Sequence, residues 1–215
     1  MPVQAKICGI NSAAAMASAL EGGAAWVGLM FFPPSPRFVT LSAAVALSMQ
    51  AADRAERVGV FVEPDDRLLA ETLNTVALDA IQLHGKESAA RVAEVRERFH
   101  LPVWKAVSIA EPADVDHARQ YCGAADRLLF DAKPPKGSKL PGGNAVTFDW
   151  TLLAGTEWPL PWLLSGGLHA GNIAEAVHLT GAKAVDVSSG VESEPGQKDP
   201  ARIRSFLAAV AAIRS

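Results

Sequence analysis

Residues 80–131 read AIQLHGKESAARVAEVRERFHLPVWKAVSIAEPADVDHARQYCGAADRLLFD, and this stretch decides the fold. Three short apolar runs alternate in it with two longer stretches in which charged residues recur at helical spacing. The runs predict strands, and the longer stretches predict helices, over Ala80–Leu83, Glu87–Phe99, Val103–Val107, Pro112–Tyr121 and Arg127–Asp131. Strands that alternate with helices in this way predict a parallel sheet.

The alternation extends in both directions along the chain. Further strands are expected at Val3–Cys8, Trp26–Phe31, Arg57–Val62, Trp162–Ser165 and Ala184–Val187. Further helices are expected at Ala13–Glu21, Ser42–Ala52, Asp66–Thr75, Asp149–Leu153, Gly171–Leu179 and Pro200–Ile213. Eight units of about 25 residues fill residues 1–215 without a linker, which predicts one α/β domain.

An open doubly wound sheet and a closed barrel both fit this alternation. An open sheet of the dinucleotide-binding kind carries G-x-G-x-x-G after its first strand, whereas this chain reads Cys8-Gly9-Ile10-Asn11-Ser12 there. Eight units in a chain near the lower size limit of the (β/α)8 barrel favour closure. We therefore predict a single (β/α)8 TIM barrel with a closed parallel sheet.

Composition narrows the class of protein. The 215 residues are 49% hydrophobic and 20% charged with a net charge of −3, which is typical of a globular protein and gives no basic surface for nucleic acid. The sequence has no run of about 18 apolar residues and no secretory signal, so no membrane association is expected. Two cysteines do not make a disulfide framework, and we expect a reduced, cytoplasmic protein.

Glycine and serine follow the last two predicted strands. Leu164-Ser165-Gly166-Gly167-Leu168 closes the seventh strand, and Ser188-Ser189-Gly190 closes the eighth. Glycines let backbone N–H groups approach an anion, and paired loops after strands 7 and 8 form the usual phosphate site of this barrel. Two tight turns would give the same dipeptides, but their positions favour phosphate binding.

Two residues at strand ends have the chemistry of proton transfer. Cys8 ends the first strand, where a thiol is either a small core residue or a base, and Lys6 on the same strand face could lower its pKa. Asp131 ends the sixth strand, where a carboxyl either pairs with Lys133 or Lys139 or serves as a general acid. The long loop from Ala132 to Thr147 is typical of an active-site lid.

Two further side chains lie in loops at the same expected end of the barrel. Arg37 follows three prolines in Phe32-Pro33-Pro34-Ser35-Pro36, which hold the loop stiffly and suit carboxylate binding, although most arginines are simply exposed. His84 follows the fourth strand and is either an acid or base or a structural hydrogen-bonding residue. No spacing of His, Cys, Asp and Glu is typical of a metal site.

Several segments, in order, resemble the phosphoribosylanthranilate isomerase family of tryptophan biosynthesis along nearly the whole chain. They are Lys6-Ile7-Cys8-Gly9, Phe32–Arg37, Gln82-Leu83-His84-Gly85, Phe130-Asp131-Ala132, Gly142-Gly143 with Phe148-Asp149-Trp150, Leu164–Leu168, Val185–Glu192 and Pro195-Gly196-Gln197-Lys198-Asp199. The resemblance implies Cys8 as base, Asp131 as acid, and Arg37 as the ligand of the anthranilate carboxylate. Ala145 stands where the family usually has a glycine, which bears on the lid more than on the chemistry.

The resemblance also implies a reaction, an Amadori rearrangement of an aminosugar phosphate that needs no cofactor and no metal. It implies a small phosphosugar as substrate. We expect a monomer or homodimer in which phosphate binds through Gly166, Gly167, Ser188, Ser189 and Gly190. Two alternatives remain open. The related histidine-pathway isomerase is expected to have an aspartate where Cys8 stands, and a silent phosphate-binding barrel would need neither Cys8 nor Asp131.

Overall fold

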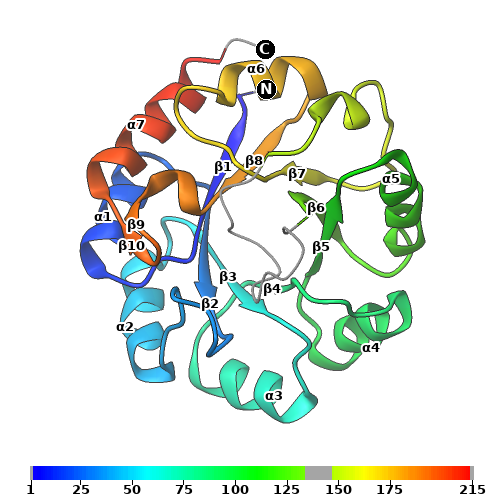
Figure 1. Cartoon of the computed structure of the whole chain (residues 1–215). Coiled ribbons are helices and arrows are strands. Elements are labelled where there is room, and N and C mark those ends of the chain that lie inside the picture. The colour runs from blue at the N-terminus through cyan, green and yellow to red at the C-terminus, as the bar shows by residue number, and fades with distance from the viewer. Residues whose placement is uncertain (1, 134–146, 214–215) are drawn as a thin grey trace.

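The computed structural model describes residues 2–133 and 147–213, and their strands form a closed parallel barrel in chain order (Figure 1). The barrel strands are β1 (Gln4–Cys8), β2 (Trp26–Met30), β3 (Glu56–Phe61), β4 (Ala80–Leu83), β5 (Val103–Ile109), β6 (Arg127–Ala132), β7 (Trp162–Leu164) and β8 (Ala184–Val187). The helices around them are α1 (Ala13–Glu21), α2 (Leu41–Ala51), α3 (Asp66–Thr75), α4 (Ala89–Phe99), α5 (Pro112–Ala118), α6 (Ile173–Thr180) and α7 (Pro200–Ala211). The predicted closed barrel is confirmed.

The barrel closes between its first and last strands. β1 pairs with β2 on one side and with β8 on the other, and the register sets Cys8 beside Gly28 and Lys6 beside Asp186. All eight strands are parallel, so their carboxyl ends meet at one end of the barrel. Residues that end strands far apart in the sequence are thereby brought to one rim.

Alternation along each strand separates two cores. A smaller cluster, which includes Trp26, Trp104 and Leu129, fills the inside of the barrel. A larger cluster of buried side chains lies between the strands and the surrounding helices. Because side chains alternate along a strand, every second residue contributes to each core.

The amino end of the barrel contains a cation packed against two tryptophan rings. The Arg127 guanidinium lies 4.7 Å from the ring centre of Trp26 and 5.0 Å from that of Trp104. Trp26 and Arg127 are the first residues of β2 and β6, so this cluster lies at the end opposite the strand-terminal side chains.

Several details differ from the sequence prediction. Residues 149–153 form only the short 3-10 helix η2 (Trp150–Leu153), and the end of the fifth predicted helix is the 3-10 helix η1 (Arg119–Tyr121). After β8 the chain makes the 3-10 helix η3 (Ser189–Val191) and then an unpredicted hairpin of β9 (Glu192–Glu194) and β10 (Gln197–Lys198). These segments are too short to show a helical or alternating period in the sequence.

Candidate active site

The side chain of Cys8 lies in a buried ionic cluster at the carboxyl end of β1. The ammonium of Lys6 donates a 2.8 Å hydrogen bond to Asp186 on the neighbouring β8, and both side chains are almost completely buried. Ser165, directly after β7, donates to the other oxygen of Asp186 at 3.2 Å. Lys6 therefore holds a fixed positive charge two residues from the thiol, on the same face of the strand.

The pKa of the thiol differs from the sequence expectation. Burial raises the pKa of Cys8, the charge of Lys6 lowers it, and the carboxylate of Asp186 raises it again, with a net increase. Burial alone would lower the pKa of Lys6, but Asp186 and Cys8 together raise it. The expectation that Lys6 lowers the thiol pKa identifies the right neighbour, but burial outweighs its effect.

Asp131 lies on β6 and makes none of the lysine pairs considered above among the described residues. Its Oδ1 accepts a 2.9 Å hydrogen bond from the N–H of Ala132, and its Oδ2 lies 3.3 Å from Nε2 of His84. Lys133 contacts Asp114 instead, at 3.3 Å, and Lys139 lies outside the described residues. Asp131 is thus buried beside a histidine at the rim.

Arg37 is buried, so the reading of it as an exposed surface arginine is wrong. Its Nε and Nη2 donate to the two carboxylate oxygens of Glu192 at 2.7 and 2.8 Å. Its side chain crosses Gly9, where a Cβ would lie 2.7 Å from Arg37 Cδ. The side chain therefore lies beside Gly9, the residue that follows Cys8, and its guanidinium is held by Glu192.

A second buried lysine joins this arginine. Lys198 donates to Glu192 at 2.7 Å and to the backbone oxygen of Ser188 at 2.8 Å. Burial lowers the pKa of Lys198 to about 8, with Glu192 acting in the opposite direction. Burial would raise the pKa of Glu192, but its bonds to Arg37 and the charge of Lys198 outweigh this and lower it. Two cations thus share one carboxylate beside the loop after β8.

The loops after β7 and β8 are packed tightly against their neighbours. A Cβ at Gly166 would lie 2.7 Å from the backbone nitrogen of Ala132, and one at Gly190 would lie 1.9 Å from the carbonyl oxygen of Leu168. Gly167 has a φ of +65°, which favours glycine. Ser189 and Gly190 lie in η3, so the two predicted phosphate-binding segments come together at the rim.

Sequence reasoning assigned no role to three charged residues of this site. Asp186, Glu192 and Lys198 are all buried, and each makes an ion pair with a residue at the rim. A carboxylate in the middle of the apolar run of β8 was the available signal for Asp186, because such a group needs a partner. Glu192 and Lys198 lie in the unpredicted hairpin, whose pairing the sequence does not reveal.

The predicted lid, Gly142-Gly143 and Ala145 lie within or partly within residues 134–146, outside the described residues. Within the described ranges, no group of three or more His, Cys, Asp or Glu side chains could hold a metal ion. No described helix is long and apolar enough to cross a membrane.

Comparison with known proteins decides the family. Residues 5–209 match the family model of N-(5'-phosphoribosyl)anthranilate (PRA) isomerase. The chain belongs to the phosphoribosylanthranilate isomerase family. It is 58% identical over 214 residues to the N-(5'-phosphoribosyl)anthranilate isomerase of Rhodospirillum centenum, covering 99% of this chain and 100% of that protein. The one from Paramagnetospirillum magneticum is 56% identical, covering 97% of each.

Solved structures of the family share the fold as well. The phosphoribosyl anthranilate isomerase of Thermotoga maritima is 34% identical and superposes with a TM-score of 0.86, covering 97% of this chain and 98% of that one. The resemblance predicted from the sequence motifs is confirmed, and with it the identification as an isomerase of tryptophan biosynthesis. The histidine-pathway isomerase is therefore not the family of this chain, and the family it belongs to is one of enzymes rather than of silent phosphate-binding barrels.

Proposed function

We propose that this isomerase converts N-(5'-phosphoribosyl)anthranilate to 1-(2-carboxyphenylamino)-1-deoxyribulose 5-phosphate with Asp131 as the acid and Cys8 as the base. The observation that carries this assignment is the position of the two groups. Both are buried at the carboxyl end of the barrel, on strands β1 and β6, and each has a fixed polar neighbour. A catalytic pair of this kind needs one group that gives a proton and one that takes it.

The steps follow from the chemistry of an N-glycoside. Asp131 gives its proton to the ribose ring oxygen, the C1′–O bond breaks, and the nitrogen lone pair forms a Schiff base. Cys8 then removes the C2′ proton as the thiolate, which its raised pKa makes the minor form at neutral pH but a stronger base, and the electron pair of that C–H bond forms the enolamine. The Cys8 thiol gives its proton to C1′, the Asp131 carboxylate takes the proton of the C2′ hydroxyl, and the aminoketose forms with both groups back in their starting states. Atoms and charge balance without a cofactor, and we expect none.

The substrate has two anionic ends, and the site offers a group for each. In this proposal Arg37, held on Glu192, binds the anthranilate carboxylate, since a fixed guanidinium suits a planar anion. The phosphate binds between the loops after β7 and β8, at Gly166, Gly167, Ser188, Ser189 and Gly190. In support, a related isomerase, 32% identical over 97% of this chain, is known in complex with the reduced product.

The remaining expectations concern the protein as a whole. We propose that residues 1–215 form one domain, that the protein is cytoplasmic, and that neither nucleic acid nor membrane is a partner. A Thermotoga maritima relative is described as a dimeric phosphoribosylanthranilate isomerase from which monomers were generated. Either state, monomer or homodimer, is compatible with the proposed site, because every residue assigned to it comes from one chain.

The test measures turnover of phosphoribosylanthranilate by its loss of fluorescence. We expect full turnover by the wild-type protein and losses of two orders of magnitude or more in Cys8→Ser and Asp131→Asn, on the scale of general acid and base catalysis. Cys122→Ser is the matched control, since the second cysteine is half-buried after η1. If either strand-end variant kept most of its kcat while folded, its proposed role would be wrong.

A further inference from the structure

A buried lysine points away from the barrel interior on β5. Lys105 alternates with Trp104 and Ala106, which belong to the inner cluster, so its side chain enters the layer between strands and helices. Lys105 as a whole is only 1% exposed. Its ammonium donates to the carbonyl of Gly85 at 2.8 Å, to that of Ala106 at 2.8 Å, and to that of Leu83 at 3.3 Å. The mechanism above makes no use of this charge.

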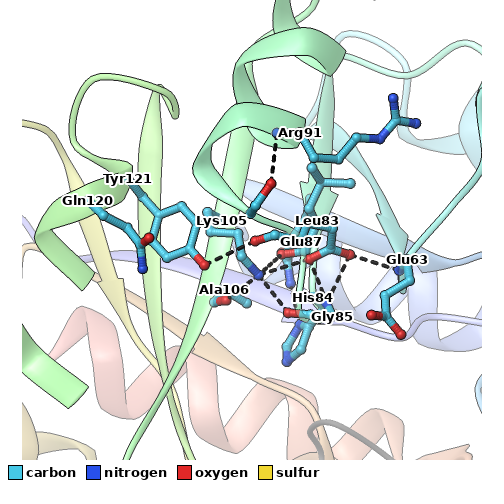
Figure 2. Close-up of polar contacts among 12 residues, drawn as sticks. Glu63, Leu83, His84, Gly85, Glu87, Arg91, Lys105, Ala106, Gln120 and Tyr121 are labelled. Atoms are coloured by element: carbon cyan, nitrogen blue, oxygen red, sulfur yellow. Dashed lines mark hydrogen bonds and ion pairs between the residues drawn. The ribbon is translucent and has the colours of Figure 1, made fainter. Parts of the chain in front are cut away.

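The partner of Lys105 is the carboxylate of Glu87, in the turn between β4 and α4. Glu87 accepts the ammonium at 2.9 Å with one oxygen. Its other oxygen accepts the N–H of Glu63 at 2.8 Å and the N–H of Gly85 at 3.1 Å. Figure 2 shows the two side chains meeting among the carbonyls and N–H groups of these turns. The pair thus joins the turns after β3 and β4 to strand β5.

These bonds fix the backbone on both sides of one residue, His84. Lys105 holds the carbonyls of Leu83 and Gly85, the residues immediately before and after His84. The ring of His84 points away from the pair in Figure 2 and reaches Asp131, with Nε2 3.3 Å from Oδ2. Its other ring nitrogen lies 2.8 Å from the amide nitrogen of Gln82. Both ring nitrogens of His84 therefore lie within hydrogen-bond distance of a polar side chain, one from β4 and one from β6.

A buried ion pair of this kind needs a reason other than stability. Removing two charges from water is expensive, and an apolar pair of similar volume is often as stable. Burial lowers the pKa of Lys105, and Glu87 only partly offsets this. The bonds that the pair makes are directional, however, and four of them fix backbone groups of one turn or its neighbours. Their common effect is to fix the position of His84.

We propose that the Lys105–Glu87 pair is a positioning element that fixes the turn after β4 so that His84 holds the carboxyl of Asp131 in place for proton transfer. This inference rests on the proposed role of Asp131. Lys105, Glu87 and His84 are positioning residues in this account, since none of them has to contact the substrate. Misplacement of a reacting group by about 1 Å costs about a hundredfold in rate, so a smaller displacement is measurable.

The test compares kcat and KM for Lys105→Met, His84→Phe and the double variant. Lys105→Met keeps the apolar stem and removes the donor, and His84→Phe keeps an aromatic ring and removes both ring nitrogens. We expect each single variant to lose about tenfold in kcat with KM within twofold of wild type. The double variant should lose no more than His84→Phe alone, because the pair acts through His84.

The matched control is the Arg57–Asp79 pair, which joins the other ends of β3 and β4. Its two hydrogen bonds of 2.7 Å resemble an ordinary structural ion pair, and it lies away from the rim. Arg57→Met should lower the melting temperature and leave kcat unchanged. A second route to the pair is Gly85→Ala, whose Cβ would lie 2.8 Å from a Glu87 oxygen and 2.6 Å from Glu63 Cγ. It should lower kcat as Lys105→Met does without deleting a charge.

Three outcomes overturn the inference. The first is full kcat in folded Lys105→Met and Gly85→Ala. The second is an additive loss in the double variant, which would mean that the pair does not act through His84. The third is an equal kcat loss in Arg57→Met, which would mean that any weakened barrel loses rate. Failure of the proposed acid role is seen separately, as retained kcat in Asp131→Asn.

Discussion

Replacing Gly28 by alanine tests whether the position of the Cys8 sulfur matters. Gly28 is the register partner of Cys8 on the adjacent strand. A Cβ built on it would lie 2.9 Å from Cys8 Sγ, 3.1 Å from Cys8 Cα and 3.3 Å from Lys6 Nζ. The added methyl group therefore contacts the thiol of Cys8, the backbone of Cys8 and the ammonium of Lys6 at once.

The size of the effect follows from these distances. An ordinary contact starts at 3.4 Å, so the sulfur has to move by about 0.5 Å. Rotation of the Cys8 side chain does not relieve the contact with Cα, so the two strands also have to separate slightly. Overpacking of this kind costs about 1–3 kcal/mol in stability. Since about 1 Å of misplacement costs about a hundredfold, we expect kcat to fall by about tenfold.

The assay is turnover of phosphoribosylanthranilate, with thermal melting measured in parallel. Gly123→Ala is the control, because a Cβ there has open space around it. It should change neither kcat nor the melting temperature by much. If Gly28→Ala were folded and had the kcat of wild type, the placement of the sulfur beside Lys6 would not matter and the base role of Cys8 would be in doubt.

The other predictions concern charge and anion binding. Because burial raises the pKa of Cys8, its alkylation by iodoacetamide in a Cys122→Ser background should be slow at neutral pH and should keep rising with pH beyond the ordinary thiol range, whereas a rate that already levels off at neutral pH would contradict the net shift. Lys198 has a lowered pKa of about 8, so it loses its proton as pH rises through that value. The net charge of the cluster formed by Arg37, Glu192 and Lys198 then falls from +1 to 0. KM should therefore rise above pH 8 in the wild type and show no such step in Lys198→Met. Arg37→Ala should weaken substrate binding by about 2 kcal/mol, the scale of a charged hydrogen bond, and a variant that still discriminates fully against the decarboxylated substrate would show that Arg37 does not bind the carboxylate. Gly167→Val should raise KM more than it lowers the melting temperature, with weaker competition by inorganic phosphate, and unchanged competition would place the phosphate elsewhere.

The barrel itself was predictable because its signals are local and repeated. Each strand is short and apolar, the stretches between strands are rich in alanine and leucine, and the closed sheet follows from eight such units. The strand-end positions of Cys8 and Asp131 follow from the same alternation. The predicted helix at residues 149–153 is instead a single 3-10 turn, since a segment this short has no period to read.

The ionic contacts of the site could not be predicted in the same way. Lys6 and Asp186 are 180 residues apart and become neighbours only when β1 and β8 close the barrel. The sign of the Cys8 pKa shift depends on the balance between burial and charge, which a sequence does not give. Lys105 has nothing in the sequence that distinguishes it from an exposed lysine, because its partner Glu87 becomes a neighbour only in the folded barrel.

A crystal structure of this protein with the reduced product 1-(2-carboxyphenylamino)-1-deoxyribulose 5-phosphate bound tests the central claim most directly. We expect phosphate at Gly166, Gly167 and the Ser188–Gly190 segment, and the carboxylate at Arg37. We also expect Cys8 Sγ to lie within about 3.5 Å of C2′, and an Asp131 oxygen within about 3.5 Å of the former ring oxygen, which is the reach of proton transfer. A ligand bound with its phosphate elsewhere, or with both side chains out of that reach, would contradict the proposed acid and base.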